Sequence, residues 1–153
     1  MNKAWAGFAA RLALGLLFIV SGSSKLSAPK EEFAVVIESY GIVGADAANA
    51  AAALLPWAEV FAGFAVLLGF QTQLASAGAG AMLLVFILAI ASTKARGIEL
   101  PNCGCFGGRF HPKPSTTMLL DSAMLLVAGL AFVYGEAKLS LDNWARGGYT
   151  QRT

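Results

Sequence analysis

The sequence predicts an all-α integral membrane protein, a bundle of four transmembrane helices with a short interfacial helix after the first span. Apolar residues make up 57% of its 153 residues and charged residues only 13%, a balance outside the usual range of soluble domains. The mean hydropathy is +0.65. Four apolar stretches come close to the roughly 20 residues that a helix needs to cross about 30 Å of hydrocarbon. They cover residues 5–22, 48–70, 74–93 and 117–135, within a single domain over residues 1–153.

The first apolar stretch, residues 5–22, has two possible interpretations. The basic start Met1-Asn2-Lys3 followed by an apolar core also fits a secretory signal peptide. Arg11 interrupts the segment, and no small-x-small cleavage site follows it cleanly. We therefore expect residues 5–22 to form a span, with the signal peptide as the alternative.

The segment after the first span carries a helical pattern of its own. Apolar side chains recur at i, i+3, i+4 and i+7 on one helical face, at Phe33, Val36, Ile37 and Tyr40. Pro29 stands near the start of this pattern, and glycines follow its end. We expect a short helix over residues 29–43 that lies on the membrane surface.

The later spans differ in composition. Residues 45–53 lead into the second span with an alanine-rich run. Residues 77–81 of the third span alternate alanine and glycine, which allows another helix to approach closely. Residues 94–116 form a long polar loop before the fourth span, residues 117–135.

Three ionisable residues lie inside the apolar stretches, namely Arg11, Glu59 and Asp121. A charge costs about 3 kcal/mol near the bilayer centre, so each is a candidate functional residue. Arg11 shares a helical stripe with glycines and Lys25, and Glu59 shares its face with Gly63. Small residues beside a charge indicate faces that meet other helices. We therefore hypothesise an ion pair between Arg11 and Glu59, which either fixes helix packing or takes part in proton or cofactor handling.

The number of spans puts the loops after the first and third spans on the same side of the membrane. Lys25 and Lys94 therefore face the side that bears Cys103 and Cys105. Further basic residues of that side are Arg96, Arg109, His111 and Lys113. A cationic neighbourhood lowers the pKa of a thiol and raises the fraction of reactive thiolate.

Cys103 and Cys105 are the only cysteines of the chain. A disulfide between cysteines one residue apart departs from relaxed geometry and is readily reduced. Gly104 between them supplies the backbone freedom that such a ring needs. Together with His111 the two thiols would give three metal ligands, fewer than the four of a structural zinc site. The pattern favours a catalytic thiol–disulfide pair over a metal site.

The chain resembles the MauE family of methylamine-utilisation membrane proteins, within the wider DoxX-like group of four-span proteins. The resemblance rests on the stripe from Arg11 to Lys25, on Pro56-Trp57-x-Glu59, on Cys103-Gly104-Cys105-Phe106-Gly107 and on Asp121. It extends from Arg11 to about Tyr134. One departure is Leu120, where members often carry an arginine.

The resemblance implies a role in the maturation of a periplasmic dehydrogenase, by disulfide formation in the small subunit of methylamine dehydrogenase with a thioredoxin-like partner. It carries over Cys103 and Cys105 as the redox pair, and the charged residues of the spans as family-pattern positions. A membrane quinone is the candidate electron acceptor, by analogy with other four-helix membrane proteins that form disulfides. Those proteins relay electrons through a second cysteine pair, which this chain lacks. Either a partner supplies that pair or the quinone approaches Cys103 and Cys105 directly.

Two other classes of protein stay open. A non-catalytic membrane anchor or assembly subunit would use the loop to dock a partner and the buried charges to specify packing. A small proton-coupled transporter would use Glu59 and Asp121 as a relay, leaving the cysteines unexplained and requiring an oligomer. The net charge of +2, without a basic run, argues against nucleic acid as a partner.

Two arguments about the orientation of the cysteine loop oppose each other. Basic residues near the span ends on the loop side are Lys25, Lys30, Lys94, Arg96, Arg109 and Lys113, against Lys3, Lys138, Arg146 and Arg152 on the other side. The positive-inside rule thus favours the cytoplasm for the loop, whereas disulfide formation requires an oxidising compartment. We expect a multi-pass protein of the bacterial inner (cytoplasmic) membrane, with the loop on the periplasmic side.

Overall fold

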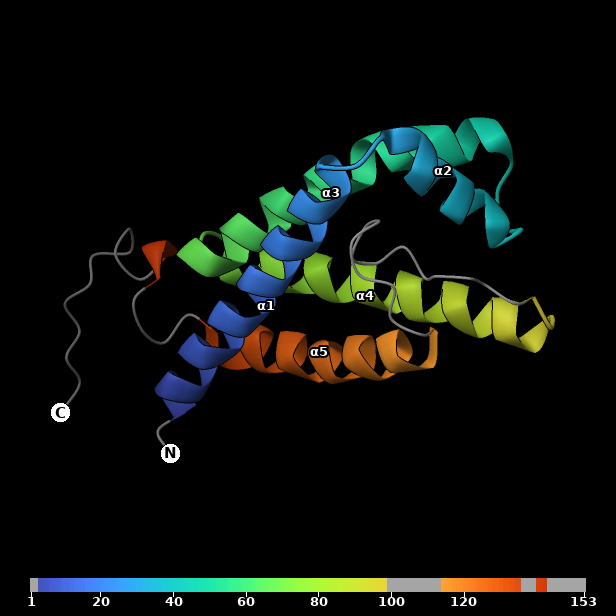
Figure 1. The fold of residues 1–153 in the computed structure, drawn as a ribbon. Helices are drawn as coiled ribbons and strands as arrows, with labels where there is room; N and C mark the ends of the chain where they lie inside the picture. The colour runs from blue at the N-terminus through green and yellow to red at the C-terminus, as the bar shows by residue number, and fades with distance from the viewer. Residues whose placement is uncertain (1–2, 99–113, 136–139, 143–153) are drawn as a thin grey trace, which may run out of the picture.

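The structure is a computed structural model that describes residues 3–98, 114–135 and 140–142 (Figure 1). These residues form the helices α1 (Lys3–Leu26), α2 (Lys30–Ser39), α3 (Ala45–Leu68), α4 (Thr72–Ala95) and α5 (Pro114–Tyr134), and no strand occurs among them. All but α2 are long and apolar enough to cross a membrane. The predicted fold class, a four-span membrane bundle, is confirmed.

The helix ends differ from the predicted span ends for local reasons. α1 continues to Leu26 instead of ending at Gly22, which brings Lys25 into the helix. α3 begins at Ala45 because its alanine run favours helix. It ends at Leu68 because Gly69 adopts a left-handed backbone with φ 70°, a common helix C-cap. α2 falls within the predicted interfacial segment.

α1 and α3 cross in close contact along the glycine faces that the sequence predicts to meet other helices. A Cβ atom added to Gly15 would lie 2.9 Å from the carbonyl oxygen of Gly63. One added to Gly22 would lie 2.7 Å from the carbonyl oxygen of Pro56. Only glycine allows the two backbones to approach this closely. The contacts also fix an antiparallel register, in which Gly15 lies opposite Gly63 and Gly22 opposite Pro56.

The main apolar core lies among α1, α3, α4 and α5. Leu14 and Phe18 of α1 pack with Val66 of α3 and Leu83 of α4, and α5 adds Ala131. α1 therefore contributes buried residues to the centre of the bundle.

α2 covers one end of the bundle. Its Phe33 is buried against Ala52 of α3, and Tyr40, which follows the helix, packs on Ile90 of α4. The guanidinium of Arg96, just past α4, donates to the carbonyl oxygens of Tyr40 and Gly41. The segment after α1 and the end of α4 thus lie at the same end of the bundle, as the predicted parity of the spans requires.

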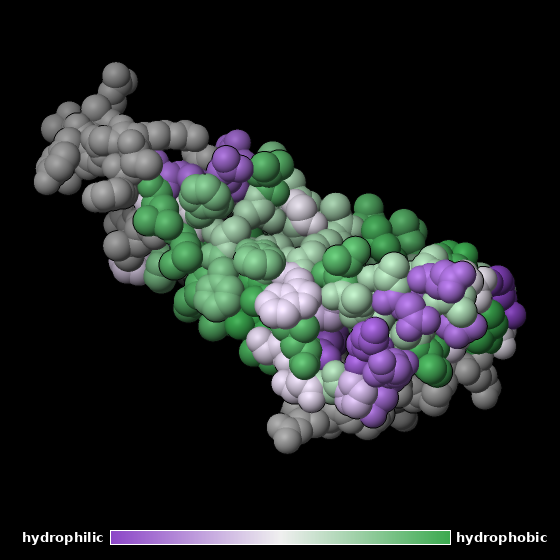
Figure 2. Space-filling view, turned by 90° about the horizontal axis from the view of Figure 1, so that it is seen from above, coloured by the Kyte–Doolittle hydropathy of each residue, from purple (hydrophilic) through white to green (hydrophobic). Residues whose placement is uncertain are grey.

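The outer surface of the spans is apolar. Leu54, Phe61, Leu74, Leu119 and Leu126 are each at least 69% exposed, which suits contact with lipid chains. Figure 2 shows hydrophobic surface along the middle of one face and hydrophilic residues gathered towards its two ends. This banding matches a protein embedded in a bilayer.

Candidate functional site

An ion pair between α1 and α3 lies in the bundle interior. The Nζ atom of Lys25 lies 2.5 Å from Oε1 and 2.7 Å from Oε2 of Glu59, and each side chain is only 1% exposed. Ser21 completes the cluster, because its hydroxyl accepts from Lys25 at 3.0 Å and donates to Glu59 at 3.1 Å. All three ammonium protons of Lys25 therefore have acceptors, which is the condition under which a buried pair is tolerated.

The sequence builds this cluster from helix geometry. Side chains of a helix lean towards its N-terminus, so Lys25 reaches back one turn to Ser21, four residues before it. Gly22 between them lets α3 approach, and a Cβ atom there would lie 3.1 Å from the Cβ atom of Glu59. The reach of Lys25 towards Ser21 and the close approach of α3 together place the Lys25 ammonium inside the bundle.

Two aromatic rings enclose the ion pair. The Nζ atom of Lys25 lies 5.2 Å from the ring centroid of Phe33 in α2 and 5.4 Å from that of Phe86 in α4. Both distances allow a cation–π attraction. The cluster thus joins side chains from α1, α2, α3 and α4.

The hypothesis of an ion pair between Arg11 and Glu59 is wrong. The α1–α3 register puts Arg11 opposite Leu67, far from Glu59, and Arg11 lies about 21 Å along α1 from Lys25 at 1.5 Å rise per residue. Its guanidinium donates to the carbonyl oxygens of Val66 at 3.1 Å, Leu67 at 3.0 Å and Gly135 at 3.1 Å. Arg11 therefore binds the C-terminal carbonyls of α3 and of the turn that ends α5, where a helix carries partial negative charge.

Close to Arg11, the carboxylate of Asp142 binds the start of α4. Asp142 accepts from the backbone N–H groups of Gln71 at 2.8 Å and Thr72 at 2.7 Å, and from the hydroxyl of Thr72. It satisfies the first N–H groups of α4 as an N-cap residue does. The end of the bundle that holds Arg11 is therefore built from helix-terminus contacts.

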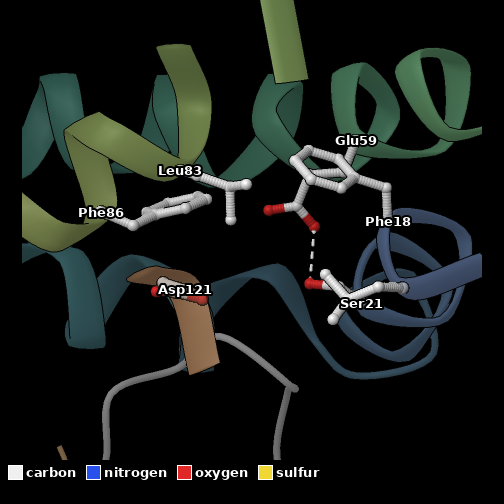
Figure 3. Close-up of a pocket in the computed structure, with 7 residues that line it drawn as sticks. Phe18, Ser21, Glu59, Leu83, Phe86 and Asp121 are labelled. Carbon is white, nitrogen blue, oxygen red and sulfur yellow. Dashed lines mark hydrogen bonds between the residues drawn. The ribbon is translucent and has the colours of Figure 1, made fainter. Parts of the chain in front are cut away.

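Asp121 of α5 belongs to the other end, beside Glu59. It is buried and lines a cavity of about 20 Å³ together with Ser21, Glu59 and Phe86. Figure 3 shows Glu59 and Asp121 at different sides of this cavity, and its dashed line marks the hydrogen bond that Ser21 of α1 donates to Glu59. A cavity of this size, lined by several polar groups, has room for one water molecule. Among the described residues no three metal-ligating side chains gather.

The structure thus brings together three of the charged candidates, Lys25, Glu59 and Asp121, and keeps Arg11 apart. Lys94 is exposed in the last turn of α4, at the end of the bundle that α2 covers. Cys103 and Cys105 lie outside the described residues. Sequence reasoning missed that the Lys25 side chain is buried, although a serine four residues earlier on the same face was a usable signal.

Comparisons with known proteins agree on one family. The model of the family described as methylamine utilisation protein MauE matches residues 3–135. The methylamine utilization protein MauE of Paracoccus denitrificans is 30% identical over 128 residues, which are 84% of this chain and 68% of that protein. No solved structure matches. The chain therefore belongs to the MauE family.

Proposed function

We propose that this protein exchanges thiols and disulfides through Cys103 and Cys105, and so supports the maturation of a periplasmic dehydrogenase in methylamine utilisation. The observation that carries the proposal is the Cys-Gly-Cys motif, which contains the only cysteines of the chain and follows α4 in sequence. Membership of the MauE family supports the link to methylamine utilisation.

The chemistry is a two-electron exchange. A thiolate of a thioredoxin-like partner attacks the disulfide between Cys103 and Cys105, a mixed disulfide forms, and one cysteine leaves as thiolate. The second thiol of the partner then resolves the mixed disulfide. The partner leaves oxidised, with its own disulfide ready for the dehydrogenase subunit, and the Cys103/Cys105 pair is left as the dithiol.

Exposed cations at one end of the bundle support this chemistry. Lys94 and Arg96, at the end of α4, are exposed and shortly precede the cysteines in the chain. Positive charge near a cysteine stabilises its thiolate, the form in which one cysteine of the pair leaves. The guanidinium of Arg96 also binds the segment after α2, and these bonds hold the end of α4 against that segment.

Single substitutions test the proposal. Cys103→Ser and Cys105→Ser should each abolish maturation of the client dehydrogenase, measured as its activity in periplasmic extracts. One of them should also accumulate a mixed disulfide with the partner, visible on a non-reducing gel. Thr116→Ser, at an exposed position of α5, is the matched control and should behave as the parent. A fully active double serine variant would instead rule out thiol exchange as the function.

The second candidate function is proton transfer through the bundle, which the shared cavity of Glu59 and Asp121 favours. It is separated from thiol exchange by the cysteine variants, because a proton-coupled transporter keeps its activity without thiols.

The orientation of the cysteine loop, which we propose to be periplasmic, has its own test. A membrane-impermeant thiol reagent added to intact cells should label Cys103 and Cys105, whereas labelling only after lysis would reverse the orientation.

A further inference from the structure

A second and larger cavity adjoins the Lys25–Glu59 pair. It has a volume of about 240 Å³ and lies among α2, α3 and α4, with walls that are almost wholly apolar. Three of its wall residues are aromatic, namely Phe33, Tyr40 and Phe86. The proposed thiol exchange gives this cavity no role.

The size and position of this apolar cavity restrict what it can hold. A cavity of about 150 Å³ with similar walls is enough to bind benzene, so 240 Å³ has room for one six-membered ring with substituents. Ile42 and Val85 line the cavity and are 55% and 63% exposed, so it opens on the lipid-facing surface. A neighbouring hollow shares these two residues and continues along Leu88. A ring that carries an apolar tail can therefore enter from the bilayer.

A buried charge lies close behind the inner wall of the apolar cavity. Lys25 lines it, and the Nζ atom lies within 5.4 Å of the centroids of two of the wall rings. Phe86 lines both this cavity and the small polar one that contains Glu59 and Asp121. The Lys25–Glu59 pair and the ring of Phe86 therefore lie between the apolar cavity and the small polar cavity.

We propose that the apolar cavity binds the ring of a membrane quinone, which reoxidises Cys103 and Cys105. This inference rests on the proposed function, since thiol exchange leaves the pair reduced and the chain has no second cysteine pair. Reduction places negative charge on the ring oxygens, and the ammonium of Lys25 at the wall complements that charge. In an apolar, water-poor site such complementarity is strong.

The overall reaction is balanced. The two thiols lose two electrons and two protons as the bond between their sulfur atoms forms, and the quinone gains two electrons and two protons to become the quinol. The two protons come from the thiols, and the ammonium of Lys25 stabilises the negative charge on the ring oxygens before they are protonated. Glu59 is a positioning residue, because it holds the ammonium through two hydrogen bonds and does not line the apolar cavity.

Binding of decylubiquinone to the purified full-length protein tests the cavity directly. The parent should bind it saturably, and Val85→Trp, which fills the mouth, should weaken binding at least tenfold. Leu126→Trp, on an equally lipid-exposed surface of α5, is the matched control and should bind as the parent. Ala89→Phe, at another wall position of the same cavity, gives a second obstruction. Equal binding by all four proteins would overturn the inference.

Single-turnover reduction separates this inference from the proposed function. Pre-reduced protein should convert one decylubiquinone to quinol per chain, measured by ultraviolet absorbance. The Cys103→Ser/Cys105→Ser variant should still bind the quinone and reduce none. If the cysteines prove essential for client maturation while decylubiquinone does not bind, the quinone site is wrong and the proposed function stands. Reduction that persists without the cysteines would show that the electrons do not come from Cys103 and Cys105 and would overturn the inference.

Lys25 and Glu59 are tested as a pair, because removal of either one strands a buried charge. The double variant Lys25→Gln/Glu59→Gln keeps the shapes of both side chains without their charges. Decylubiquinone should bind to it within about threefold of the parent, whereas the single-turnover rate should fall at least tenfold and lose its parental pH profile. An unchanged rate and profile would remove Lys25 from the reaction.

Discussion

The two buried cations of α1 are stabilised in different ways. Counted over the whole residue, Arg11 is 1% exposed and Lys25 is 3% exposed. Arg11 donates to backbone carbonyls at the ends of two helices and is attracted by Asp142, whereas Lys25 forms a direct ion pair with the carboxylate of Glu59. The first arrangement uses the partial charges that every helix end provides. The second needs a particular acid, and it borders both cavities.

This comparison shows that burial of a charge within a membrane bundle does not by itself identify a functional residue. Arg11 ties α1 to the ends of α3 and α5, which is a packing role. Lys25 lines a cavity that opens on the lipid-facing surface, and its partner Glu59 shares a second cavity with another buried acid, Asp121. What distinguishes the two cations is the space next to them.

The largest effect is expected from Glu59→Leu. It leaves the ammonium of Lys25 buried without a counter-charge, which costs about 3–5 kcal/mol of unfolding free energy. Chemical unfolding in detergent, followed by circular dichroism, measures this loss. The double variant Lys25→Met/Glu59→Leu should recover most of the stability. If Glu59→Leu is as stable as the parent, the ion pair has no structural weight.

Arg11→Lys should cost less, about 1–3 kcal/mol, because an ammonium cannot reproduce the planar fork that reaches three carbonyls. The same unfolding assay measures it. Thiol exchange per folded molecule should stay at the parental level, since Arg11 lies at the opposite end from Lys25. If Arg11→Lys instead lost thiol exchange while its stability stayed unchanged, Arg11 would have more than a packing role.

Gly22→Ala tests the close approach that lets the ion pair form. The added methyl group meets the backbone of Pro56, so the helices must shift, at about 1–3 kcal/mol. Gly78→Ala is the matched control, because nothing lies within 4 Å of a Cβ atom there. The control should be neutral or slightly stabilising. Equal effects in the two variants would mean that α1 and α3 can move apart at Gly22 without a loss of stability.

Asp142→Ala should have the smallest effect, about 1 kcal/mol, the usual value of a lost helix cap. The loss comes from the first N–H groups of α4, which the carboxylate accepts. Asp142→Asn keeps an acceptor and should lose less. Thermal unfolding of the three proteins ranks them, and an asparagine variant less stable than the alanine variant would contradict the capping role.

The spans and the interfacial helix were predictable because each is encoded by local hydropathy and periodicity. The glycine faces of α1 and α3 were predictable as well, since small residues beside a charge mark a contact. The partner of Glu59 was not, because it depends on the axial register of two helices. That register is set by Gly15, Gly22 and Gly63 together, and no single helical pattern reveals it.

The site itself was predictable only in part. Glu59 and Asp121 were identified as buried acids from their place in apolar stretches, but their common cavity follows from how α3 and α5 pack around α1. The apolar cavity depends on α2 folding back over α3 and α4, with Phe33 and Phe86 brought together from distant parts of the chain. Such volumes are properties of packing, for which the sequence offers no local signal.

The contacts of Arg11 have a consequence for how the bundle is assembled. α1 is synthesised before α5, yet one of the guanidinium bonds of Arg11 goes to Gly135, just beyond the last residue of α5. That bond can form only after α5 has been synthesised and has packed against α1. During insertion α1 therefore lacks one of its contacts until α5 arrives.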